Sequence, residues 1–97
     1  MREAEYRSFL EHAESINSKS KAVRSRISRA YAAEEILGNS LDYIVTDDDR
    51  MYDALVKIHA DPKENNGKIQ NAVRWYYKFV NKKDFPRLSS YCRSNRV

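Results

Sequence analysis

The chain has 97 residues and a formal net charge of +4, and it is 41% hydrophobic and 33% charged, with two glycines and two prolines. This length suits one domain with one hydrophobic core, and so few turn-forming residues argue against an all-β fold. No apolar run approaches the roughly 18 residues of a membrane span, so we expect a soluble cytoplasmic protein. The single cysteine excludes an internal disulfide and a thiolate metal cluster, and we expect no cofactor or metal.

Apolar side chains recur at the spacing of one helix face in two stretches near the N-terminus. The first stretch predicts a helix from about Glu3 to Ser15. The second predicts a helix that begins at Ser18 or Ser20, whose hydroxyl can accept a backbone N–H, and that runs to about Leu37. Gly38 is the predicted C-terminal cap, because glycine adopts the left-handed conformation without a Cβ penalty.

An apolar connector at 41–45 follows, and we expect it to pack under the helices rather than to lie in solvent. Thr46 with Asp49 three residues later is typical of a capping box, which predicts the start of a third helix. That helix carries several acidic residues in its first turn, where they favour the positive end of the helix dipole. It should stop near Asp61, since Pro62 disfavours helix in the residue before it.

The turn-forming sequence at 65–67 precedes the strongest helical pattern of the chain, which predicts a fourth helix over Ile69–Val80. Beyond it, Pro86 can occupy the first turn of a short fifth helix. The sequence thus predicts an all-α fold, a compact antiparallel bundle of four main helices over 1–83, with a C-terminal tail or short helix over 84–97.

The charges are segregated along the chain. Residues 1–31 hold seven basic and four acidic side chains, residues 32–61 hold two and eight, and residues 62–97 hold nine and two. A folded domain with this pattern presents a basic surface from its first and last thirds, for which a polyanion is the predicted partner. The alternative is that the charges only keep exposed helix faces solvated.

A polar stripe lies opposite the buried side of the fourth helix, and the second helix carries cations and serines without an intervening acid. Lysine and arginine neutralise phosphates, hydroxyls position them, and asparagine can read an adenine edge. The alternative for Trp75 is that it extends the core. The residues predicted to contact double-stranded DNA are Lys19, Lys21, Arg24, Ser25 and Arg29 in the second helix, and Lys68, Asn71, Arg74, Trp75, Lys78 and Lys82 in or beside the fourth.

Four features follow one another along residues 5 to 81: an aromatic-led first helix with Tyr6 and Phe9, a second helix opened by Ser and Lys, a connector around Ile44, and the segment Asn71–Val80. This order resembles the N-terminal core-binding (SAM-like) domain of tyrosine recombinases and phage integrases. The resemblance implies a four-helix module that clamps duplex DNA through its second and fourth helices. The positions it carries over are Lys21, Arg24 and Ser25 on the second helix and Asn71, Arg74 and Lys78 on the fourth.

The chain lacks what recombinase catalysis needs. It is too short for the catalytic domain of that family, and neither His12 nor His59 begins a His-x-x-Arg motif. Asp47, Asp48 and Asp49 do not form a predicted metal site, because consecutive helical residues point about 100° apart. We therefore expect a module that is not catalytic by itself, either a stand-alone accessory protein or a fragment of a larger recombinase-like or nuclease-like enzyme.

A second functional class fits the same pattern. The acidic third helix, with Asp47 and Asp53, can dock on a basic protein partner or on the basic face of another copy of the chain. Concentration-dependent oligomerisation would favour this protein-interaction or assembly module, whereas salt-dependent affinity for duplex DNA favours the first class. Neither class calls for a membrane or a small-molecule substrate.

Overall fold

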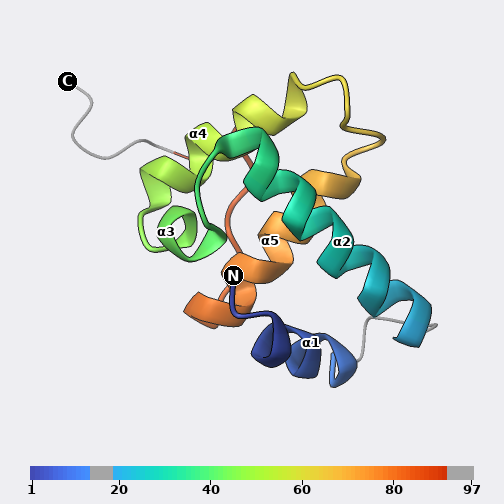
Figure 1. Ribbon diagram of the computed structural model, residues 1–97. Helices are drawn as coiled ribbons and strands as arrows, with labels where there is room; N and C mark the ends of the chain where they lie inside the picture. The colour runs from blue at the N-terminus through green and yellow to red at the C-terminus, as the bar shows by residue number, and fades with distance from the viewer. Residues whose placement is uncertain (14–18, 92–97) are drawn as a thin grey trace.

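The computed structural model describes residues 1–13 and 19–91, with the side chains of the second helix described from Lys21 onwards. The described residues form helices joined by short connections and contain no strand, which confirms the predicted all-α fold (Figure 1). The helices are α1 (Glu3–Glu11), α2 (Lys19–Leu37), α3 (Leu41–Val45), α4 (Asp48–His59) and α5 (Lys68–Asn81).

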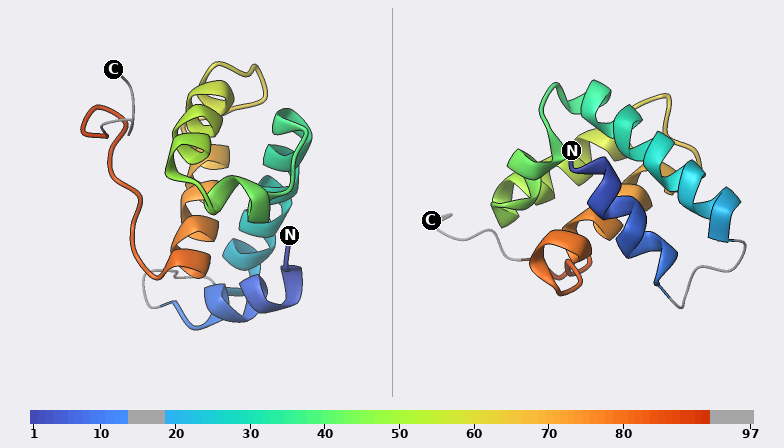
Figure 2. Two further views of the ribbon diagram at one scale, coloured as in Figure 1. Left: turned by 90° about the vertical axis from the view of Figure 1, so that its left-hand side faces the viewer. Right: turned by 60° about the horizontal axis from the view of Figure 1, so that its bottom comes forward.

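The longest helix, α2, crosses α5 at the centre of the molecule (Figure 1). The short helix α1 packs against both of them on one side, and α3 and α4 pack against both on another. In the left view of Figure 2, the segment that follows α5 turns back along α5 toward α4. No described helix is both long enough and apolar enough to cross a membrane.

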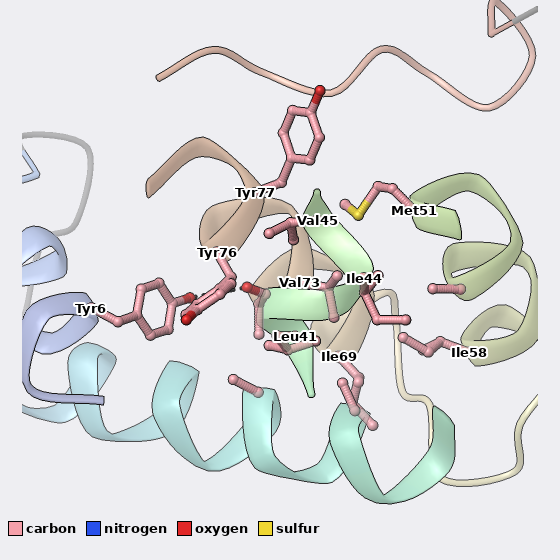
Figure 3. Packing of buried hydrophobic residues seen from close by; sticks show 14 of the residues in the cluster. Tyr6, Leu41, Ile44, Val45, Met51, Ile58, Ile69, Val73, Tyr76 and Tyr77 are labelled. Atoms are coloured by element: carbon pink, nitrogen blue, oxygen red, sulfur yellow. Dashed lines mark hydrogen bonds between the residues drawn. The ribbon is translucent and has the colours of Figure 1, made fainter. Parts of the chain in front are cut away.

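One hydrophobic core joins all five helices, and three buried tyrosines occupy much of it. Tyr6 and Tyr76 point toward one another from α1 and α5, with ring centroids 4.9 Å apart (Figure 3). Each of the three hydroxyls donates a hydrogen bond: Tyr6 to the carbonyl of Ala72 at 3.0 Å, Tyr76 to Asp42 at 2.5 Å, and Tyr77 to Asp48 at 2.8 Å. Tyrosine therefore fills this core without leaving a polar group unsatisfied.

The first helix is shorter than predicted, since α1 ends at Glu11 and not at Ser15. The ring Nδ1 of His12 donates to the carbonyl oxygen of Ser8 at 2.7 Å, and the backbone N–H of His12 donates to the carbonyls of the last turn. These bonds satisfy acceptors that an ended helix leaves free, so the helix can stop there.

The limits of α2 agree with the prediction at its C-terminus. Gly38 has φ +71° and its N–H donates to the carbonyl of Glu34 at 2.8 Å, as expected of a left-handed cap. At the other end, Ser20 lies inside the helix, which begins at Lys19, so Ser20 is not its N-cap. Residues 14–18, with the other candidate Ser18, lie outside the described residues.

The apolar connector contains a helix that the sequence did not predict. In α3, the side chain of Ser40 caps the N-terminus by accepting from the N–H of Tyr43 at 3.3 Å. Leu41, Ile44 and Val45 are buried, as expected of a connector that packs under the other helices. Five residues are less than two turns, so α3 has too little length to show helical periodicity.

The predicted capping box at the start of α4 is wrong. Asp47 is the N-cap, and its carboxylate accepts from the N–H of Asp49 at 3.1 Å. Thr46 instead ends α3, with its hydroxyl donating to the carbonyl of Tyr43 at 2.9 Å. Only two residues, Thr46 and Asp47, separate α3 from α4, and the threonine bonds to the first of these helices. The helix ends at His59, close to the predicted stop before Pro62.

The predicted short helix beginning at Pro86 is absent from the described part of the tail. Phe85 is buried in the core, and the carbonyls of Phe85 and Pro86 accept hydrogen bonds from Arg74 instead of from a following helical turn. Tyr91 stacks on Tyr52 of α4 with ring centroids 5.3 Å apart. The segment at 84–91 is therefore attached to α4 and α5 by its aromatic side chains.

Candidate nucleic-acid interface

The outer face of α2 gathers the predicted residues of that helix. Lys21 and Arg24 are exposed, and Ser25 and Arg29 are partly exposed. Together with Ser28 they line a shallow surface hollow of about 410 Å³. Residues four apart on a helix project from the same side, so Lys21, Ser25 and Arg29 form one row about 12 Å long. The side chain of the remaining candidate, Lys19, lies outside the description.

No described carboxylate lies within ion-pair distance of Lys21, Arg24 or Arg29. In contrast, Arg7 and Arg50 each pair with a carboxylate on their own helix or its cap. A helix tuned only for solubility gains a few tenths of a kcal/mol from each opposite charge placed four residues away. The outer face of α2 lacks such pairs and leaves its positive charge available to a ligand.

On α5, Arg74 has a structural role. Its guanidinium donates to the carbonyl oxygens of Phe85 at 2.9 Å and Pro86 at 3.2 Å. Burial lowers the pKa of Arg74 below its ordinary value. Both hydrogen bonds come from Nη1, so Arg74 holds the tail through one of its guanidinium nitrogens. Arg74 therefore serves the fold by holding the segment that follows α5.

The other predicted polar residues in or beside α5 are accessible. Lys68, Asn71 and Lys82 are exposed, and Lys82 ends the helix with φ +64°. Lys78 pairs with Asp84 at 3.6 Å, but the Asp84 side chain is 82% exposed, and such surface pairs contribute little. Asn71, Lys78 and Trp75 border a hollow of about 260 Å³ that Arg74, Asp84 and Phe85 complete.

Trp75 joins the two helices. The guanidinium of Arg26 on α2 lies 5.0 Å from the centre of its ring, and the ammonium of Lys78 lies 5.4 Å from it. Phe9 of α1 contacts the same ring, with a centroid distance of 6.1 Å. Trp75 is thus half-buried: it extends the core, as the alternative interpretation held, and it also brings a cation from α2 and one from α5 onto one side chain.

Arg26 was not among the predicted contact residues. Its Nε is buried and has no hydrogen-bond partner among the described residues. Burial lowers the pKa of Arg26, the buried Tyr6 acts to raise it, and the neighbouring Arg29 lowers it. The sequence signal was present, since Arg26 lies three residues after the buried Val23 and therefore near the core side of α2.

The acidic residues of α4, which is the predicted third helix, take part in contacts within the fold. Asp47 caps the helix and pairs with Arg50 at 3.5 Å. Asp48 accepts from the hydroxyl of Tyr77 at 2.8 Å, and Asp49 accepts from that of Tyr91 at 2.6 Å. These bonds fix α5 and the following segment to the start of α4. The acidic cluster predicted as a docking surface is thus largely occupied by intramolecular partners.

Within residues 1–13 and 19–91, no three His, Cys, Asp or Glu side chains gather as a metal site requires. The concavities that hold the predicted residues are open and lined by cations, hydroxyls and an indole. Searches against protein-family models, curated proteins and solved structures found no match to this chain.

Proposed function

We propose that this chain binds double-stranded DNA through the outer face of α2, without catalysing a reaction itself. The observation that carries the proposal is the set of three cations, Lys21, Arg24 and Arg29, that have no ion-pair partner among the described residues and share one hollow with two serines. Cations with hydroxyls between them are the side chains that contact DNA phosphates.

The contacts divide between the two helices. Lys21, Arg24 and Arg29 neutralise phosphates, and Ser25 hydrogen-bonds to a phosphate oxygen between them. On α5, Lys68 and Lys82 extend the positive surface, and exposed Asn71 can present its amide to a base edge. The contact of Arg26 and Lys78 with one indole ring supports a surface that passes from α2 to α5.

This proposal keeps the predicted partner and narrows the predicted contact set. A core-binding domain, which the order of features resembles, clamps DNA through the corresponding helices, and we leave Arg74 out of the proposed contacts because its Nη1 already bonds to the tail. The alternative, a protein partner docked on α4, has less support, because Asp47, Asp48 and Asp49 already hold the fold together.

The test is a fluorescence titration of a generic duplex with the wild-type chain and with the Arg24→Glu/Arg29→Glu variant. Both substitutions lie on the outer face of α2, so the fold should remain intact. A matched control, Lys57→Glu/Lys63→Glu, changes the net charge by the same amount at exposed positions on α4 and the loop after it. We expect the α2 variant to abolish binding and the control to retain most of it. Equal losses of affinity in both variants would mean that binding depends only on net charge, and would reject an interface on α2.

A further inference from the structure

The outer face of α2 changes sign along its length. Its first half lines the basic hollow already described, with Lys21 and Arg24. Its second half lines another hollow, of about 560 Å³, bordered by Ser28, Tyr31, Ala32, Glu34 and Glu35. Ser28 borders both hollows and therefore marks the point at which the surface turns from basic to acidic.

Lys21, Ser28 and Glu35 lie on one stripe of the helix. They are spaced seven residues apart, and seven residues are close to two turns of an α-helix, with a drift of only about 20°. All three side chains are exposed. Lys21 and Glu35 are therefore placed on the same side of α2 at equal distances from Ser28, about 10.5 Å before it and about 10.5 Å after it.

Within the described ranges, neither of these two charges, Lys21 and Glu35, has an ion-pair partner. Along α2, the residues three and four positions from each of them that the structure describes carry no opposite charge. Glu34 differs, because it turns inward and accepts from the N–H of Leu41 at 2.8 Å. As far as the described residues go, the stripe thus has an unpaired cation at one end and an unpaired carboxylate at the other.

We propose that α2 pairs with α2 of a second copy of this chain, antiparallel and about a two-fold axis at Ser28. An interface about a two-fold axis uses the same patch on both copies, so a patch must be complementary to itself when reversed. Reversal about Ser28 brings Lys21 of each copy opposite Glu35 of the other and forms two equivalent ion pairs. The sign change along α2 is what makes the stripe complementary to itself.

The neighbouring positions fit the same axis. Tyr31, three residues after Ser28, comes opposite Ser25, three residues before it, and Arg24 comes opposite Ala32. Tyr31 is 44% exposed, although its hydroxyl donates to Glu3, and it provides the large apolar contact of the pair. Tyrosine is enriched in protein interfaces, and the facing serine and alanine leave room for it and for the arginine.

The pairing does not rest on the proposed binding of DNA, but it uses part of the same surface. Lys21 and Arg24 cannot contact a phosphate and the second copy at once. Binding of duplex DNA and pairing of α2 are therefore mutually exclusive, and by thermodynamic linkage each weakens the other to the same degree. A pair of copies is the resting form, and DNA dissociates it.

The first experiment measures self-association by sedimentation in the absence of nucleic acid, at about 50 mM salt, where screening is weak. We expect a dimer that dissociates as salt rises. Lys21→Glu and Glu35→Lys each place two like-charged pairs in the interface and should give monomers, whereas the Lys21→Glu/Glu35→Lys double variant should restore the dimer. Lys57→Glu on α4 is the control that leaves association unchanged. Monomers at about 1 mM wild-type protein, or a double variant no better than the singles, would overturn the proposal.

The second experiment locates the axis by an intermolecular disulfide in a Cys92→Ser background. Helices that pack about 8–10 Å apart bring facing Cα atoms at a two-fold axis to about 3.4–5.4 Å, which overlaps the range for a disulfide. Ser28→Cys should crosslink rapidly, and Lys57→Cys should not. Equal rates for the two variants would reject an axis at Ser28. Because neither experiment contains DNA, both outcomes are independent of the proposed function.

Discussion

The guanidinium of Arg74 donates to the carbonyl oxygen of Phe85 at 2.9 Å, and the ring of Phe85 is buried in the core. An arginine on the last long helix thereby fixes the segment that follows it. The same guanidinium lies 5.8 Å from the centre of the Phe85 ring, and the ring of Tyr77 also contacts Phe85, with a centroid distance of 5.1 Å. Arg74 therefore contributes to stability.

Replacing Arg74 with Ala should destabilise the fold by about 1–3 kcal/mol, because the partly buried carbonyl of Phe85 and the exposed carbonyl of Pro86 lose a charged donor. Thermal unfolding measures the effect. Lys82→Ala, which removes an exposed cation at the end of the same helix, should change the free energy of unfolding by less than about 0.5 kcal/mol. If the two variants melt at the same temperature, the contact of Arg74 with the tail does not stabilise the fold.

Stability should fall at alkaline pH because the native state holds several tyrosines neutral. Burial, together with a hydrogen bond to Asp42, raises the pKa of Tyr76 to about 12, although the N–H of Arg2 acts to lower it. Burial also raises the pKa of Tyr6 and of Tyr77. An unfolded tyrosine ionises near pH 10, so this stability is present below about pH 10 and is lost as pH rises toward the folded values.

Urea denaturation between pH 8 and the alkaline range measures this loss. Tyr76→Phe lacks the ionisable group, so its stability should depend less steeply on pH above about pH 10. Tyr43→Phe, at a residue 51% exposed, is the matched control and should follow the wild type. A wild-type stability that stays constant across this range would contradict the claim that the folded protein keeps these hydroxyls neutral.

The N-cap of α4 gives a test of local structure. Asp47→Ala should cost about 1 kcal/mol, since the N–H of Asp49 loses its acceptor. Thr46→Ala should cost less, because both hydrogen bonds of its hydroxyl, to the carbonyl of Tyr43 and from Arg50, are exposed to solvent. The comparison of the two melting temperatures decides between the two caps, and a larger loss in Thr46→Ala would restore the capping box.

Removing the carboxylate of Asp84 should strengthen binding of DNA. Asp84 pairs with Lys78 at 3.6 Å and is highly exposed, so Asp84→Asn frees a cation of the proposed interface and removes a charge that repels phosphate. We expect the dissociation constant to fall by about twofold to fivefold. Glu11→Gln, at an exposed position on α1, is the control for net charge. An equal gain in the control would show that Lys78 takes no part.

The long helices were predictable because each buries a stripe of apolar side chains at regular spacing. The buried positions of α5, from Ile69 to Tyr77, repeat every three or four residues. Gly38 was predictable for a local reason, since its positive φ favours glycine. In contrast, α3 is too short for periodicity, and the choice of Asp47 over Thr46 depends on where α3 ends.

The candidate site was predictable only in part. The exposed positions Lys21 and Arg24 follow from their places opposite the buried side of α2. The engagement of Arg74 with the tail was not predictable, because its partners are backbone carbonyls, which leave no signal in the sequence. Arg26 lies near the core side of its helix, and its contact with Trp75 depends on the packing of α2 against α5.

The salt dependence of DNA affinity tests the proposed interface most directly. We would measure the dissociation constant for a generic duplex between about 50 and about 200 mM salt, for the wild type and for the Lys21→Ala/Arg24→Ala/Arg29→Ala variant. Three phosphate contacts on α2 alone predict a slope of about −2.7 in the logarithmic plot, or a loss of about 40-fold, and the variant should lose that part of the slope. Affinity that does not change with salt, or a variant with the wild-type slope, would contradict binding through α2.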